Sequence, residues 1–198
     1  VPKTELSIPQ KNSLVLYRDR PAIVKKTGDR PEIELEDGRT QQVRLKDVAL
    51  LHSGPLAGFA ELTEQEGDLE TAWELLGGEG TDIGELADLI YGTYSPATAW
   101  AAWQHVDDRL FFTGTPDRVL PRTEEEVERK REERKSKAAN QQAWAAFLER
   151  ARAGTCEHED AGFLEEVEEL ALGQKTAGRA LKELGRKETA ENAHALLL

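Results

Sequence analysis

The side chains best suited to metal binding or acid–base catalysis are few and scattered. Cys156 and His158 have the C-x-H spacing of one pair of zinc ligands, whereas a structural zinc site needs about four ligands. Asp107 and Asp108 form an acidic pair without the further carboxylates that a two-metal nuclease requires. The glycine-rich run at 77–80 follows no predicted strand and precedes no lysine, so it is not a phosphate-binding loop. We therefore expect no catalytic residue, metal ligand or cofactor site, and this chain alone is not expected to be an enzyme.

Basic side chains that could contact RNA phosphates are more informative, because most of them lie in one predicted β-rich segment. An aromatic ring beside them could add a stacking surface for bases. The alternative is that these cations pair with Glu32, Glu34 and Glu36 across neighbouring strands, as in any small β-structure. The candidate RNA-binding residues are Tyr17, Arg18, Arg20, Lys25, Lys26, Arg30, Arg39, Arg118 and Arg122.

The elements that must position these cations are short strands between residues 13 and 53. The runs SLVLY, RPAIVKK, EIELE, RTQQVRL and DVALL each read as a strand, and Asp37-Gly38 between two of them is a strong hairpin signal. Several strands in about 40 residues predict a small barrel of the SH3-like kind. Residues 1–12 are expected to be an extended arm, and residues 54–67 a linker.

Residues 68–122 are predicted to form a winged helix-turn-helix domain. A first helix, DLETAWELL, precedes the motif. Asp82 is a suitable N-cap for the second helix, with Glu85 completing a capping box. Ser95 caps a third helix that opens with Pro96, and two short strands around the turn at 113–117 form the wing.

The charge of this domain argues against a role in reading duplex DNA. The third helix carries no Lys or Arg, and neither does any other position from 48 to 108. The same stretch holds twelve acidic residues, which equals the net charge of −12 of the whole chain. Because attraction to phosphates supplies most nonspecific affinity for nucleic acids, such a surface should repel a duplex. We expect the domain to act as a packing or interaction module.

A long charged helix is predicted for residues 123–153, with Thr123 and Glu126 as its capping box. Its segment 129–137 holds six basic and two acidic residues, which is either a solvated face or a guide for an RNA backbone. Its second half gains an apolar stripe that should dock on a partner surface, formed by Ala143, Trp144, Phe147, Leu148 and Ala151. Residues 154–198 contain three shorter helical segments and end in an apolar run. We interpret them as the start of a truncated following domain.

A length of 198 residues suits one or two compact domains, and the predicted strands and helices place the fold in the α+β class. The single cysteine, Cys156, cannot form an internal disulfide and favours a reducing compartment. No apolar run approaches the roughly 20 residues of a membrane helix. The expected localisation is the cytoplasm, without a membrane partner.

Three segments together resemble a known family. SLVLYRDRPAIVKKTG, then ELADLIYGTYSPATAWAAWQHVDDRLFF, then PRTEEEVERKREE are similar to the N-terminal region of ribonuclease II-type (RNB family) exoribonucleases. The variant resembled is the bacterial and plastid one, with an SH3-like barrel and a winged helix in place of cold-shock domains. The resemblance covers residues 13–135 well and the remaining helices loosely.

The resemblance implies a parent enzyme that degrades single-stranded RNA from its 3′ end, with Mg²⁺ held by aspartates of a catalytic domain. This sequence contains no D-x-x-x-T-x-D-x-D-D cluster and no S1 barrel, so no catalytic residue is carried over. The expected function is an N-terminal portion that guides RNA, with single-stranded RNA and the catalytic part of the parent as partners. The alternative is a stand-alone winged-helix interaction protein or transcriptional regulator.

Overall fold

The computed structural model describes residues 9–197, so most of the predicted arm at 1–12 lies outside the described residues. The fold is α+β, with a five-stranded antiparallel sheet followed by helices. The chain divides into two compact units, one up to Lys130 and one from Arg131 onward. The two units are described separately.

The sheet of the first unit is built from the five predicted strands, in the order β4-β3-β2-β1-β5. A 3-10 turn at Leu45–Asp47 leads from β4 into β5. Adjacent strands pair antiparallel throughout, which is consistent with a small barrel. The strands are β1 Leu14–Tyr17, β2 Arg20–Lys26, β3 Glu32–Leu35, β4 Thr40–Gln42 and β5 Val48–His52.

Successive side chains of a strand point to opposite faces of the sheet. Both faces are buried here. Val15, Val24 and Ile33 belong to a core on one face. Leu14 and Leu16 of β1 belong to a second core, which is shared with the helices that follow. One face of the sheet thus covers a core of its own, and the other hydrophobic face packs against the helices that follow.

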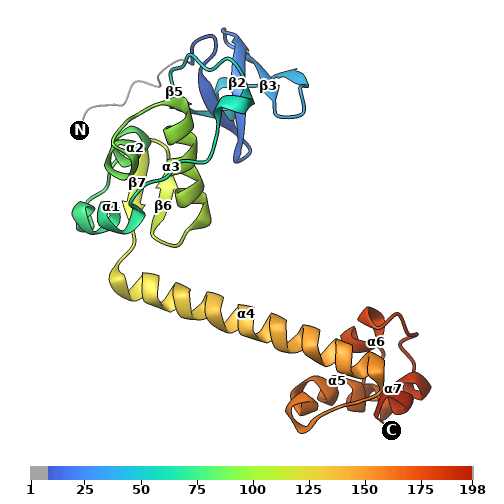
Figure 1. The fold of residues 1–198 in the computed structure, drawn as a ribbon. Helices are drawn as coiled ribbons and strands as arrows, with labels where there is room; N and C mark the ends of the chain where they lie inside the picture. The colour runs from blue at the N-terminus through green and yellow to red at the C-terminus, as the bar shows by residue number, and fades with distance from the viewer. Residues whose placement is uncertain (1–8, 198) are drawn as a thin grey trace. The chain divides into compact units, whose positions relative to one another are not determined.

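Three helices and a hairpin follow in the order predicted for a winged helix-turn-helix (Figure 1). Asp82 caps α2 by accepting from the backbone N–H groups of Gly84 and Glu85. Glu85 does not complete the capping box; its carboxylate instead accepts a 2.6 Å hydrogen bond from the Thr81 hydroxyl. Ser95 caps α3, and Thr98 closes a capping box there. The elements are α1 Leu69–Leu76, α2 Ile83–Tyr91, α3 Pro96–Asp108, β6 Phe112–Thr115 and β7 Arg118–Pro121.

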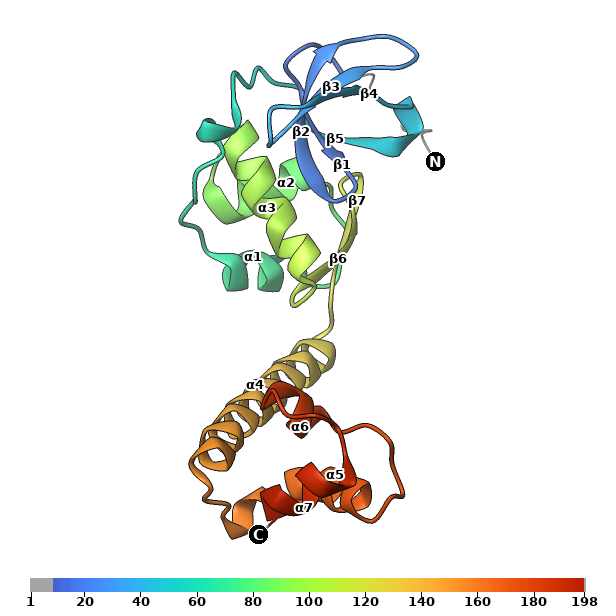
Figure 2. The same ribbon diagram turned by 90° about the vertical axis from the view of Figure 1, so that its right-hand side faces the viewer.

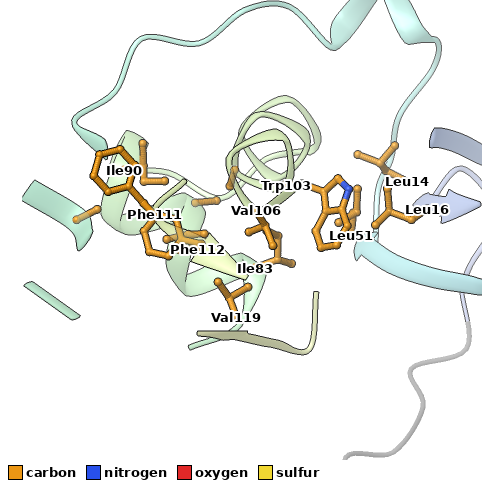
Figure 3. Packing of buried hydrophobic residues seen from close by; sticks show 14 of the residues in the cluster. Leu14, Leu16, Leu51, Ile83, Ile90, Trp103, Val106, Phe111, Phe112 and Val119 are labelled. Atoms are coloured by element: carbon orange, nitrogen blue, oxygen red, sulfur yellow. The ribbon is translucent and has the colours of Figure 1, made fainter. Parts of the chain in front are cut away.

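Trp103 of α3 joins the winged helix to the sheet. Its indole is 6% exposed and lies in one core with Leu14, Leu16 and Leu51. Figure 3 shows the ring directed from α3 toward these three leucines. Tyr94, in the turn between α2 and α3, donates a 2.6 Å hydrogen bond to the Leu51 carbonyl. The sheet and the winged helix therefore share one hydrophobic core within the first unit.

The second unit is helical. The helix α4, Glu124–Ala153, begins in the first unit with the predicted Thr123–Glu126 capping box and continues into the second. It is followed by a 3-10 turn at His158–Asp160 and by α5 Ala161–Ala171, α6 Arg179–Glu183 and α7 Ala190–Leu197. The last half of α4 packs with these three helices (Figure 2). They form the partner surface predicted for its apolar stripe.

The core of the second unit contains Phe147 from α4, Val167 and Leu170 from α5, Leu181 from α6 and Leu196 from α7. Leu196, on the last helix, is 8% exposed. None of the helices in residues 9–197 is long and apolar enough to cross a bilayer.

Candidate nucleic-acid interface

Three of the predicted RNA-binding cations form ion pairs with carboxylates of the sheet or of the turn between β3 and β4. Lys25 lies 2.5 Å from a carboxylate oxygen of Glu34, and Lys26 lies 3.0 Å from one of Glu32. These pairs join β2 to β3, where Lys26 faces Glu32 in the strand register. Arg39 pairs with Asp37, and its hydrogen bonds hold the pKa of that carboxyl below its ordinary value. Lys25 and Lys26 thus form the ion pairs across neighbouring strands that the sequence offered as the alternative to RNA binding.

Tyr17, Arg18 and Arg20 remain together at the turn between β1 and β2. The guanidinium of Arg18 lies over the Tyr17 ring, 5.2 Å from its centroid. Arg18 and Arg20 are exposed and make no ion pair with any described residue. Arg30 is also exposed, but it follows the other end of β2 and does not belong to the same cluster. We call Tyr17, Arg18 and Arg20 the turn cluster.

A cleft of about 850 Å³ adjoins the turn cluster, between the sheet and the winged helix. Arg18 and Lys46 are the cations that line it. The carboxylates of Asp19, Asp47, Asp82 and Asp117 also line it. Because carboxylates outnumber cations there, the interior of the cleft does not favour a phosphate chain.

Arg118 and Arg122 are not brought together by the structure. Arg118 is exposed at the start of β7. Arg122 follows the other end of β7, with only 17% of its side chain exposed. It donates to the Arg109 carbonyl at 3.1 Å and to Glu126 at 3.4 Å. Arg122 thus holds the junction between the wing and α4.

The third helix of the winged domain does not present a surface for base reading. Six of its thirteen residues are buried, including Ala99, Ala102 and Trp103. Its face toward the sheet is occupied by the shared core. The polar residues left exposed on it include Gln104, Asp107 and Asp108. A helix that enters a major groove usually carries cations for phosphates beside its base-reading donors, and α3 has the amide of Gln104 but no lysine or arginine.

The acidic residues of the winged region all face solvent. Each of the twelve between positions 48 and 108 is exposed. They are Glu61, Glu64, Glu66, Asp68, Glu70, Glu74, Glu79, Asp82, Glu85, Asp88, Asp107 and Asp108. This acidic surface repels phosphates, so it does not favour a contact with nucleic acid.

The basic segment of α4 is exposed along most of its length, but part of it is already engaged. Arg129, Arg131 and Arg134 interact with other residues of the chain, and Lys135 lies 4.0 Å from Glu132. Lys137 is exposed and has no ion-pair partner among the described residues. The excess positive charge available to a ligand is therefore smaller than the sequence count indicates.

The structure reveals one cluster that the sequence did not indicate. The guanidinium carbon of Arg179 on α6 lies 4.3 Å from the ring centroid of Trp144 on α4. Glu183 accepts from the Trp144 indole at 2.8 Å and from Arg179 Nε at 2.7 Å. These hydrogen bonds, the one from Trp144 foremost, hold the pKa of Glu183 below its ordinary value. Trp144, Arg179 and Glu183 are the stacked trio.

No group of three or more potential metal ligands occurs in residues 9–197. Cys156 is exposed.

The comparison with known families adds one finding. Residues 125–198 match the family model HTH_RNase_II, described as a double HTH domain. No curated protein matches the chain, and no solved structure does.

The match covers α4 and the three short helices, which are the elements that pack around the core of the second unit. It supports an RNase II-related identity for this part of the chain. The sequence interpretation found the same relationship from segments farther toward the N-terminus, but it missed the helix-turn-helix character of residues 125–198. A usable signal was Gly185 between two apolar helical segments, since glycine readily ends one helix before the next begins; in the structure this glycine is left-handed, with φ 71°.

Proposed function

We propose that this chain is the N-terminal, RNA-guiding part of a 3′-to-5′ exoribonuclease of the ribonuclease II type. The observation that carries the proposal is the match of residues 125–198 to the double HTH domain of RNase II. The five-stranded sheet then plays the part of the SH3-like barrel, and the catalytic RNB domain with its Mg²⁺ belongs to another part of the parent enzyme.

The charge distribution supports different roles for the sheet and for the winged helix. The turn cluster offers two unpaired cations and an aromatic ring, which is the chemistry of a single-strand contact. The acidic surface repels RNA and its charge is complementary to a basic surface of the catalytic part. In this proposal the sheet contacts the RNA, and the winged helix serves as the scaffold that holds the sheet in place.

The burial of α3 also supports a scaffold over a transcriptional regulator. A regulator would have to bring this helix to a duplex, which would separate Trp103 from the leucines of the sheet. Exposing such a side chain costs about 2–3 kcal/mol before any DNA contact forms. The structure offers no lysine or arginine on α3 to offset that cost.

Fluorescence anisotropy with a labelled single-stranded RNA tests the proposal. Arg18→Ala with Arg20→Ala removes two phosphate contacts. The plot of the log of the association constant against the log of the salt concentration should therefore become less steep by about 1.4. Lys26→Ala with Arg39→Ala removes the same charge from paired cations and should change the slope little. Absence of RNA binding by the unmodified chain would refute the proposal, as would metal-dependent RNA cleavage by this chain alone.

A further inference from the structure

A polar groove of about 500 Å³ runs along α4 beside the stacked trio. Ser136, Lys137, Asn140, Gln141 and Trp144 line it from α4, and Arg179 lines it from α6. We propose that this groove binds one nucleotide of single-stranded RNA, with its base stacked on the guanidinium of Arg179. The inference rests on the proposed RNA-guiding function and assigns it a second contact site, in the double HTH domain.

The guanidinium of Arg179 is held in place before any ligand arrives. One of its faces lies against the Trp144 ring, and Glu183 fixes its Nε. The same carboxylate holds the indole N–H, so the two planar groups are positioned by one acceptor. The backbone N–H of Arg179 also donates to Glu166, at 2.5 Å. A guanidinium that is held by a ring and a carboxylate in this way loses little conformational entropy when it binds a ligand.

The side of Arg179 away from Trp144 remains accessible. Its side chain is 63% exposed, although Nε is engaged. Guanidinium planes stack on nucleobases, and every base has a face that can be used in this way. A base placed there would complete a continuous stack of indole, guanidinium and base.

The remaining groups of the groove suit the other parts of a nucleotide. Asn140 and Gln141 are exposed amides that both donate and accept hydrogen bonds, as a base edge requires. Ser136 and Lys137 lie about one helical turn before them, where a ribose and a phosphate can be held. The volume falls in the range of small-ligand sites, and a paired base in a duplex would not present its face to Arg179.

The site should bind mainly by stacking, in contrast to the turn cluster. Glu183 already offsets the charge of Arg179, and Glu133, which also lines the groove, brings a negative charge that balances the positive charge of Lys137. Little counterion release is therefore expected on binding here. Loss of the stack should lower RNA affinity without changing its salt dependence, whereas loss of the turn cluster should change both.

The test uses the full chain and a fluorescein-labelled single-stranded RNA of twelve nucleotides. Arg179→Lys keeps the charge but removes the planar face, and it should weaken binding about tenfold with an unchanged salt slope. Asn140→Ala with Gln141→Ala changes exposed residues that are not needed for folding, and it should also weaken binding. The control is Lys182→Ala, an exposed cation of the same helix outside the groove, which should bind RNA as the unmodified chain does.

Several outcomes would overturn the inference. If Arg179→Lys binds RNA like the unmodified chain while the turn-cluster variant does not, the groove is not a nucleotide site and the proposed function survives. If the unmodified chain binds no RNA, both proposals fail. If polyglutamate competes for the groove and its binding depends on Arg179 to the same degree, the groove belongs to acidic peptides. An equal loss of affinity for duplex RNA would exclude the single-strand assignment.

Discussion

Replacing Trp103 by alanine tests whether the winged helix and the sheet are one cooperative body. The indole is 6% exposed and contacts residues of both modules, so its loss leaves a cavity between α3, β1 and β5. Substitution of a buried aromatic residue by alanine costs about 3–5 kcal/mol. That is a large part of the roughly 5–15 kcal/mol that stabilises a typical domain. We expect Trp103→Ala to lower the melting temperature of the first unit by roughly 10–20 °C.

Trp103→Phe separates the contribution of the ring from that of the indole N–H. The Trp103 Nε1 atom is buried without a hydrogen-bond partner in the described structure. Removing that group relieves an unsatisfied donor, which offsets part of the volume that is lost. The phenylalanine variant should therefore cost less than about 1.5 kcal/mol. Gln104→Ala, on the exposed face of the same helix, is the neutral control.

Hydrogen exchange with mass spectrometry on the full chain provides the decisive measurement. In Trp103→Ala, protection should fall in peptides from β1 and β2 as well as in peptides from α2 and α3, because all of them border one core. Faster exchange confined to α2 and α3, with the sheet as protected as before, would refute the shared-core reasoning. It would also restore α3 as a helix able to leave the sheet and approach a duplex.

Three further predictions concern stability. Ser95→Ala removes the N-cap of α3 and should cost about 1 kcal/mol in urea unfolding; a neutral result would show that the Pro96 turn holds the helix alone. Phe147→Ala should destabilise the second unit by about 3–5 kcal/mol, and a matching loss of protection in the first unit would contradict their separate cores. Burial lowers the pKa of His52 and of His105, so the first unit should lose stability as the pH falls through about 6.5, where the unfolded chain takes up more protons. Replacing both histidines by glutamine should flatten this profile in thermal melts, and an unchanged slope would exclude them as its source.

Local chemistry was sufficient to predict most elements of this fold. Asp82, Ser95 and Thr123 cap their helices as expected, because capping depends on neighbours within three residues. The same local reasoning was wrong at Glu85, whose carboxylate accepts from the side chain of Thr81 instead of closing a capping box with the cap residue. Competition among nearby polar groups is not visible in a spacing rule.

The candidate sites were less predictable, since they depend on contacts between distant segments. The pairing of Lys25 and Lys26 could be considered from the sequence but not decided, because it depends on the register of β2 against β3. Trp144 was expected only as part of an apolar stripe. Its contact with Arg179 joins residues on different helices, and no periodic pattern links two such positions.

The shared core has a consequence for the segment between β5 and α1. Glu64 and Glu66 are exposed there, while the flanking modules are held together by Trp103 and by the hydrogen bond from Tyr94 to Leu51. A protease that nicks the backbone at these glutamates should leave two fragments that stay associated. The exposed part of the segment is then not needed to hold the two modules together, and insertions at these glutamates should be tolerated without loosening the sheet from α3.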